Sequence, residues 1–271
     1  MATAARLRDV GWAWDGQAIN GSVKLSIFGT GAGTRWFGLR RCCHMFHDNS
    51  ALALQQLTDM AEVVCEISKW DFEVVTDHPR YHGLGSPIRG VHDGRLARKV
   101  AEADRVGRLA LAFPNLTGIY DDDLLGKIKT EHLSAEQYAG VRRAAQAHNP
   151  ALKLWAVVYT HELSPEPWQG FEPILDVINL WVWKSADLVR LDEDLARCRE
   201  LFPGKPIVMG CYLRDFTLGA GLPMDRLRLQ WEKVVEYLDR DLISGFNILG
   251  GFLIDTDEEQ ARWVRDFIAA H

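Results

Sequence analysis

The sequence predicts a single domain, residues 1–271, folded as a closed (β/α)8 barrel of the TIM type. From residue 38 to the carboxyl terminus, short apolar segments alternate with longer segments that have helical periodicity. The apolar segments are nearly continuous, as expected of parallel strands that are covered on both faces. A chain of 271 residues, 47% of them hydrophobic, also has the usual size of one such barrel. An open, doubly wound sheet is the alternative.

Residues 1–37 are expected to form an N-terminal extension that includes the first strand. The segment GWAWDGQAING (11–21) has the character of a hairpin, and VKLSIF (23–28) is the candidate for the first barrel strand. The glycine-rich segment FGTGAGT (28–34) has Thr34 where a G-x-G-x-x-G motif needs its last glycine. We therefore expect a turn there and no phosphate-binding loop.

The remaining seven strands and most helices follow in strict alternation over residues 38–271. The strands are predicted at 38–47, 63–70, 116–123, 152–162, 176–184, 206–215 and 245–255. The helices are predicted at 50–60, 94–111, 134–149, 187–201, 224–240 and 257–270. A loop rich in glycine, proline and histidine is expected from the second of these strands to about residue 93. With VKLSIF the strands number eight, which closes a barrel.

Charge and composition exclude several classes of partner. The formal net charge of −6 argues against binding to nucleic acid, which needs a basic surface. No apolar run approaches the roughly 20 residues of a membrane span, and the N-terminus lacks the apolar region of a signal peptide. The five cysteines show no C-x-x-C spacing and are expected to be buried, reduced thiols. We therefore expect a cytoplasmic protein, or a secreted one if a signal peptide has been removed.

Polar and aromatic residues gather where the predicted strands end, whereas the strand beginnings carry few. The carboxyl ends of the strands form the active site in barrels of this type, so this asymmetry is the strongest functional signal in the sequence. Paired carboxylates can act as acid, base or nucleophile on a glycosidic bond. Aromatic rings offer apolar faces to the C–H faces of a sugar ring. The pattern therefore favours a carbohydrate substrate.

The segment LTGIYDDDLL (116–125) supplies the first catalytic candidate. If Ile119 faces the helices, strand alternation turns Tyr120 and Asp122 toward the barrel axis and Asp121 away from it. Asp122 is the predicted catalytic carboxylate, and Asp123 is a like-charged neighbour that shifts its pKa. The structural alternative for these aspartates is a loop or helix-capping role.

Two further carboxylates are candidates for the catalytic partner. Asp215 ends YLRD (212–215) further round the barrel, where an acid or base would oppose Asp122; a local ion pair with Arg214 is the alternative. Glu66 lies inside an apolar strand, where a carboxyl group is rarely found without a specific reason. That reason is either a catalytic or hydroxyl-binding role, or a salt bridge in the barrel core.

Aromatic, histidine and other polar residues at the strand ends are expected to hold the substrate. Alternation along LWAVVYTHE turns Trp155, Tyr159 and His161 inward, and alternation along INLWVW turns Asn179, Trp181 and Trp183 inward. The predicted substrate-binding residues are His44, His47, Trp70, Tyr120, Tyr159, His161, Glu162, Trp181, Trp183, Tyr212 and Arg214.

The segment GIYDDDL resembles the strand end G-[IV]-x-x-D-D-[FY] of several carbohydrate-active TIM-barrel families. It is also distantly similar to the strand that carries the acidic cluster in chitinase-like glycoside hydrolases. This resemblance covers residues 38–271 and implies a glycoside-hydrolase-like barrel without naming a family. Leu124 stands where the pattern has an aromatic residue, and no D-x-x-D-x-D-x-E series is present. A chitinase mechanism is therefore not implied.

These observations lead to one preferred function and two alternatives. The preferred function is hydrolysis of a glycosidic bond in a small carbohydrate or oligosaccharide, with no cofactor, no metal and no nucleic-acid or membrane partner. The first alternative is a sugar isomerase, epimerase or aldolase that uses a metal held by His44 or His47 with Glu66 and Asp122, or a Schiff base on Lys184. The second is a barrel that binds glycans without catalysis.

Overall fold

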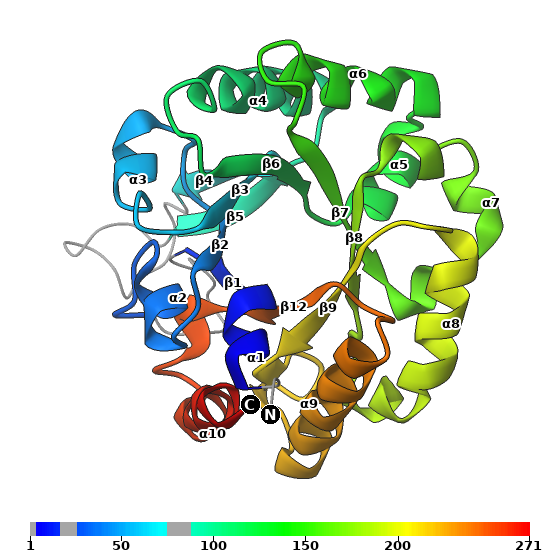
Figure 1. Cartoon of the computed structure of the whole chain (residues 1–271). Coiled ribbons are helices and arrows are strands. Elements are labelled where there is room, and N and C mark those ends of the chain that lie inside the picture. Colours follow the sequence, from blue (N-terminus) through cyan, green and yellow to red (C-terminus); the bar gives the residue numbers. More distant parts are fainter. Residues whose placement is uncertain (1–3, 17–25, 75–87) are drawn as a thin grey trace.

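The computed structural model describes residues 4–16, 26–74 and 88–271, and it confirms the predicted (β/α)8 barrel (Figure 1). Eight parallel strands close in the order β1-β12-β9-β8-β7-β6-β3-β2, because β1 pairs with both β12 and β2. The barrel strands are β1 (Gly11–Asp15), β2 (Arg41–His44), β3 (Glu62–Glu66), β6 (Leu116–Asp121), β7 (Lys153–Tyr159), β8 (Val177–Trp181), β9 (Ile207–Tyr212) and β12 (Gly245–Leu249).

Helices surround the barrel on all sides in Figure 1. The α-helices are α1 (Ala4–Val10), α2 (Ala32–Trp36), α3 (Ala51–Gln55), α4 (Leu96–Leu109), α5 (Leu124–Glu131), α6 (Ala135–Gln146), α7 (Pro165–Trp168), α8 (Leu191–Leu201), α9 (Met224–Asp239) and α10 (Glu258–Ala270). Short 3-10 helices are η2 (Thr160–Glu162), η3 (Glu172–Ile174), η4 (Ser185–Arg190) and η5 (Gly251–Leu253). In the described parts of the chain, no helix has the length and apolar character needed to cross a membrane.

The prediction for the first strand was wrong. Gly11–Asp15 is the first barrel strand and not one arm of a hairpin, and it pairs in parallel on both sides. Residues 26–28 of the VKLSIF candidate are not in a strand, and its residues 23–25 lie outside the described residues. The physical reason is that Trp12 points into the barrel, where its ring centroid lies 4.8 Å from that of Trp155. A strand whose tryptophans fill a barrel looks, in isolation, like an amphipathic hairpin arm.

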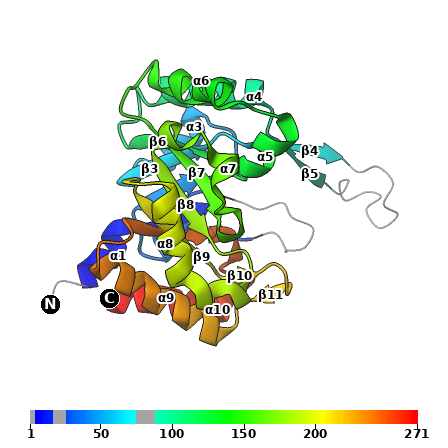
Figure 2. The same ribbon diagram turned by 90° about the vertical axis from the view of Figure 1, so that its right-hand side faces the viewer.

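Two antiparallel hairpins project from the same end of the barrel, at the right of Figure 2. One joins β4 (Lys69–Val74) to β5 (Ile88–Asp93), and the other joins β10 (Arg214–Asp215) to β11 (Ala220–Gly221). The predicted loop up to residue 93 is therefore partly a hairpin. Because both hairpins follow the carboxyl ends of barrel strands, they flank the end of the barrel at which a site is expected.

A polar network crosses the middle of the barrel. The hydroxyl group of Tyr120 donates to Oδ1 of Asn179 over 2.6 Å, and Nδ2 of Asn247 donates to the same oxygen over 2.8 Å. Nδ2 of Asn179 donates to the carbonyl oxygen of Val208 over 2.9 Å. These contacts confirm that Tyr120 and Asn179 face inward, as strand alternation predicted.

Glycine on one strand makes room for an indole from the next. A Cβ atom on Gly210 of β9 would lie only 2.0 Å from Cδ2 of Trp181 on β8. A Cβ atom on Gly118 of β6 would lie 3.2 Å from Cδ1 of Trp155 on β7. The inner layers of the barrel therefore alternate between very small and very large residues, which keeps the interior filled.

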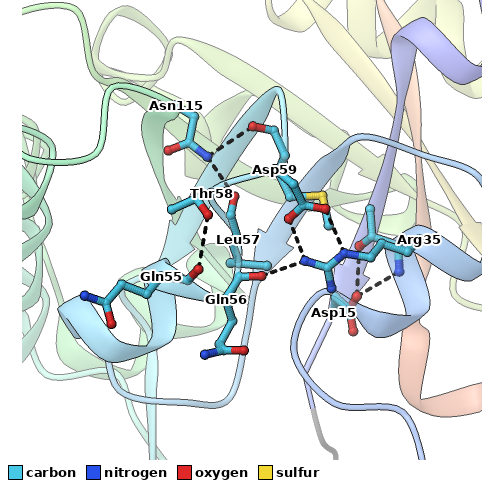
Figure 3. A network of polar contacts seen from close by, with 10 residues as sticks. Asp15, Arg35, Gln55, Gln56, Leu57, Thr58, Asp59 and Asn115 are labelled. Carbon is cyan, nitrogen blue, oxygen red and sulfur yellow. Dashed lines mark hydrogen bonds and ion pairs between the residues drawn. The ribbon is translucent and has the colours of Figure 1, made fainter.

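Contacts outside the barrel hold the segment that leads into β3 (Figure 3). Arg35 of α2 donates to both carboxylate oxygens of Asp59, over 2.8 and 2.6 Å, and to the carbonyl oxygen of Gln56 over 2.6 Å. Nδ2 of Asn115 donates to the carbonyl oxygens of Leu57 and Met60, over 2.9 and 3.1 Å. Because Asn115 directly precedes β6, these bonds fix the start of β3 beside the start of β6.

We predict that Gly210→Ala lowers the free energy of unfolding by about 1–3 kcal/mol, because the added methyl group must displace a packed indole. Urea denaturation followed by tryptophan fluorescence would measure this loss. Gly140→Ala is the matched control, since the nearest atom to an added Cβ there is 3.9 Å away and the position lies inside α6. That control should gain about 0.5–1 kcal/mol. Equal effects of the two substitutions would contradict the packing argument.

Candidate functional site

The three consecutive aspartates after β6 occupy three different environments. Asp121 points outward into a fully buried network, where it accepts hydrogen bonds from Ser68 and Lys99 and, over 2.7 Å, from the hydroxyl group of Tyr138. The ammonium group of Lys99 forms a salt bridge with it, and both side chains are completely buried. The charge of Asp121 is therefore compensated, and its outward direction agrees with the prediction.

Asp122 lies one residue further on and faces the opposite side. Its side chain is 6% exposed, and no donor in the described part of the chain hydrogen-bonds its carboxyl group. Burial, followed by the nearby carboxylates of Asp123, Glu66 and Asp121, raises the pKa of Asp122 well above its usual value. Burial raises the pKa of Tyr212 on the inner face of the barrel, and the nearby charge of Asp122 adds to this rise. Asp122 is thus a buried carboxyl group at the mouth of the barrel whose surroundings favour its neutral form.

Glu66 is the last residue of β3 and lies opposite Tyr120 in the parallel register, so it shares the inner face. Its Oε2 accepts a hydrogen bond from the backbone N–H of Phe46 over 2.8 Å, and its Oε1 is buried with no partner among the described residues. Burial raises the pKa of Glu66 to about 7, although the nearby charge of Lys69 opposes this rise. Burial therefore favours the neutral form of Glu66.

Glu66 and Asp122 come from neighbouring strands. Residue Ile67 bonds through its backbone N–H to the carbonyl oxygen of Tyr120, over 2.9 Å, so the pairing continues past the end of β3. Burial first, and then the charges of Asp123 and Glu66, raise the pKa of Asp122, so the carboxyl groups of Glu66 and Asp122 lie within electrostatic range of each other. The structure therefore brings these two predicted carboxylates together.

Asp123 begins helix α5 in the left-handed backbone region, with φ of 50°. Aspartate tolerates this region better than most residues. Its Oδ1 accepts a hydrogen bond from the hydroxyl group of Tyr159 over 2.9 Å, and the side chain is exposed. Asp123 therefore sits at the rim, above Asp122.

Asp215 has a different environment from Glu66 and Asp122. Its Oδ2 accepts from the backbone N–H of Ser185 over 3.0 Å, and its Oδ1 accepts from Thr217, through backbone and hydroxyl, and from the N–H of Leu218. Burial alone would raise the pKa of Asp215, but these hydrogen bonds lower it to about 2. Arg214 donates to Asp257 over 2.9 Å and to the carbonyl oxygen of Gly219. Both residues hold the loop that follows β9.

Four of the predicted substrate-binding residues meet around one cleft of about 510 Å³. The cleft is lined by Tyr159, His161, Glu162 and Trp183, together with Asp123, Gly126, Lys127 and Thr130. Trp181 and Tyr212 lie deeper, with ring centroids 4.7 Å apart, and both are buried. Tyr120 lies deeper still, in the polar network of the barrel core. The predicted residues thus lie at successive depths, from Tyr120 in the barrel core to Trp183 in the cleft at the rim.

His44 and His47, which were also predicted to bind substrate, do not line this cleft. His44 pairs in register with Cys65, which faces outward with Ile119, so His44 lies on the outer face of β2 and does not line the barrel interior. It is fully buried, and burial lowers the pKa of His44 to about 3. His47 is partly buried beside it, with ring centroids 6.2 Å apart. Trp70 is in β4, and its side chain lies outside the described residues.

Sequence reasoning missed an aromatic group on the β1 side of the barrel mouth. The ring of Phe46 lies 5.0 Å from that of Trp14 and 5.6 Å from that of Phe252. Its backbone N–H is also the donor to Glu66. Lys69 was not among the predicted substrate-binding residues; its Nζ donates to the carbonyl oxygen of His47 over 2.7 Å. The alternation of Trp12 and Trp14 in GWAWD was the available signal for the aromatic group.

Possible metal ligands do not converge in the described part of the chain, where no three His, Cys, Asp or Glu side chains could hold an ion together. The set proposed for the metal-dependent alternative is divided, because His44 lies on the outer face of the sheet while Glu66 lies on the inner face. The five cysteines are free and buried, as predicted.

Solved structures share this architecture. The β-glucuronidase of Bacteroides uniformis matches with a TM-score of 0.55 and 12% identity, over 90% of this chain but 30% of its own. The chitinase of Chromobacterium violaceum matches with a TM-score of 0.53 and 12% identity, over 94% and 99% of the two chains. The GH53 catalytic domain of Ignisphaera aggregans matches with a TM-score of 0.52 and 10% identity, over 91% and 85%.

The chain has the barrel fold of glycoside hydrolases. At identities of 8–15%, these likenesses establish the fold alone. The glycoside-hydrolase-like barrel corresponds to about 30% of the length of the β-glucuronidase, so that enzyme carries much additional chain. No protein-family model matches the sequence, and no curated protein is significantly similar to it.

We predict that Glu66→Gln stabilises the protein at neutral pH and has no effect near pH 4. The folded protein holds the Glu66 proton up to a pKa of about 7, whereas the reference pKa is 4.5. The unfolded chain therefore binds fewer protons between these values, and wild-type stability falls as pH rises from 4.5 to 7. Glutamine mimics the protonated acid and avoids this loss, which amounts to about 3 kcal/mol above pH 7.

Urea denaturation of the wild type and the variants across pH 2–8 would test this. Asp215→Asn is the matched control with the opposite sign, because the pKa of Asp215 is lowered to about 2. That substitution should destabilise the protein at neutral pH, and the difference should shrink as the pH falls below 4 toward 2. A gain from Glu66→Gln that is constant between pH 4 and 8 would show that folding does not raise the pKa of Glu66.

Proposed function

We propose that the protein is a glycosidase whose catalytic pair is Asp122 and Glu66. The observation that carries this proposal is a pair of buried carboxyl groups at the carboxyl end of neighbouring strands. One oxygen of Glu66 is buried without a partner among the described residues, and Asp122 is buried beside the carboxyl groups of Asp123 and Glu66. Perturbed carboxyl groups in such a position are typical of catalytic sites. The glycoside-hydrolase-like fold and the aromatic rim support the same assignment.

The surroundings of the two carboxyl groups assign their roles. Neighbouring carboxyl groups that interact strongly lose their protons in separate steps, so one remains protonated while the other is ionised. Glu66 has the N–H of Phe46 and the charge of Lys69 to stabilise its anion. Asp122 has no hydrogen-bond donor among the described residues and lies close to the carboxylates of Asp123 and Glu66. Asp122 is therefore the acid, and Glu66 the base or nucleophile.

In the proposed hydrolysis, Asp122 donates a proton to the leaving group, and Glu66 acts on the anomeric carbon or on the attacking water. Asp122 protonates the glycosidic oxygen as its bond to the anomeric carbon breaks, and the leaving sugar departs as an alcohol. Glu66 either attacks the anomeric carbon or takes a proton from the attacking water, according to the separation of the two carboxyl groups. A water molecule supplies the hydroxyl group and the proton that restore both residues.

Asp215 was the sequence-based choice for the partner of Asp122, and the proposal replaces it with Glu66. The reason is that loop donors occupy both oxygens of Asp215, which is therefore stabilised as an anion in a fixed position. Such a group has little freedom to exchange a proton with a substrate. We assign it instead to holding the β9 loop beside Ser185.

We predict that Asp122→Asn lowers turnover by about 10²–10⁴ or more, while fold and sugar affinity persist, because the amide cannot donate the acid proton. Assays would use 4-nitrophenyl glycosides of glucose, galactose, glucuronic acid and N-acetylglucosamine, with chitin oligosaccharides alongside. Asp266→Asn, on the exposed surface of α10, is the control and should leave the rate unchanged. Unfolding of the Asp122 variant at moderate temperature would identify a structural role. Sugar binding by the wild type without any turnover would favour a non-catalytic glycan-binding barrel.

We further predict that activity does not require a metal ion, because no three possible ligands converge in the described part of the chain and His44 lies on the other face of the sheet from Glu66. Dialysis of the wild-type protein against a strong chelator should leave the hydrolysis rate and the melting temperature unchanged. Loss of activity that a divalent ion restores would instead support the isomerase-like alternative, with His47, Glu66 and Asp122 as the first ligands to substitute.

A further inference from the structure

We propose that the cleft between α5 and the ends of β7 and β8 is a second sugar-binding subsite, so that the substrate is an oligosaccharide and not a simple glycoside. This inference rests on the proposed function, because it extends the same site. Its volume of about 510 Å³ falls within the range of about 300–1,000 Å³ typical of small-ligand sites.

Trp183 gives the cleft a fixed aromatic wall. Its ring stacks on that of Phe216 with centroids 5.9 Å apart and planes 10° apart, and meets those of Tyr159 and Tyr212 edge-on at 5.8 and 6.2 Å. Despite these three contacts, 38% of Trp183 is exposed. An indole that is held in place and still open to solvent loses little conformational freedom when a sugar ring packs on it.

Polar groups around this wall match the hydroxyl groups of a sugar. Glu162 is partly exposed and is anchored by the backbone N–H of Tyr159, which donates to its Oε2 over 3.0 Å. The ring of His161 stacks on that of Tyr159, with centroids 5.3 Å apart. Asp123 accepts the Tyr159 hydroxyl hydrogen bond through one oxygen. The carboxylates accept hydrogen bonds from sugar hydroxyl groups, while the imidazole can donate or accept.

The position of the cleft ties it to the proposed catalytic pair. Asp123 lines the cleft and is adjacent in sequence to Asp122, and Tyr159 contacts Asp123 from the neighbouring strand β7. A chain of sugar units whose scissile bond lies at Asp122 would therefore place the next unit against Trp183. This arrangement favours substrates of at least two sugar units over a single sugar joined to a small leaving group.

The test compares substrates of different length on the wild type and on Trp183→Ala. The ratio of kcat/KM for a trisaccharide to kcat/KM for the matching 4-nitrophenyl glycoside should exceed one in the wild type. In the variant this ratio should fall about tenfold or more, the scale on which truncating a central tryptophan is felt. Trp263→Ala on α10 is the matched control and should leave the ratio unchanged.

The possible results distinguish failure of the subsite proposal from failure of the glycosidase proposal. Hydrolysis with a ratio that Trp183→Ala does not change would overturn the subsite and leave the glycosidase proposal standing. If the wild type neither hydrolyses nor binds any glycoside or oligosaccharide of the series, by rate assay and by calorimetry, both proposals fail. To exclude a folding defect, the melting temperature of Trp183→Ala should match that of Trp263→Ala within a few degrees.

Discussion

The buried ion pair between Asp121 and Lys99 sets the position of the whole site. Alternation along a strand means that an outward Asp121 requires an inward Asp122, and a slip of one residue would exchange them. Lys99 comes from α4 and Tyr138 from α6, so two helices hold the strand end in this register. Breaking such a pair by removing one partner typically costs about 3–5 kcal/mol. The buried ion pair of Asp121 thus fixes the position of Asp122, the next residue in the chain.

The barrel mouth contains two kinds of buried carboxyl group, and the difference lies in their donors. Asp121 and Asp215 are each surrounded by donors that compensate for their burial. Glu66 and Asp122 lack enough donors, so burial favours their neutral forms. A fold that retains such groups gives up stability at neutral pH. Groups of this kind are concentrated where proteins transfer protons, because a carboxyl group that holds its proton near pH 7 can donate it there.

Much of the barrel was predictable because strand alternation is a local property. The directions of Tyr120, Asp121 and Asn179 follow from residues beside them in the chain. The role of GWAWD was not predictable in the same way, since its tryptophans pack against Trp155, far along the chain. Asp215 and Glu66 look alike in sequence, as acids at strand ends. Only the loop geometry that aims the N–H groups of Ser185 and Leu218 at Asp215 distinguishes them, and no sequence pattern reveals it.

Helix α1 and the carboxyl-terminal residue His271 lie at the end of the barrel opposite the two hairpins, as Figure 2 shows. The site therefore opens away from the places where further chain would attach. A tag or a solid support joined at either end would therefore leave the mouth of the barrel unobstructed.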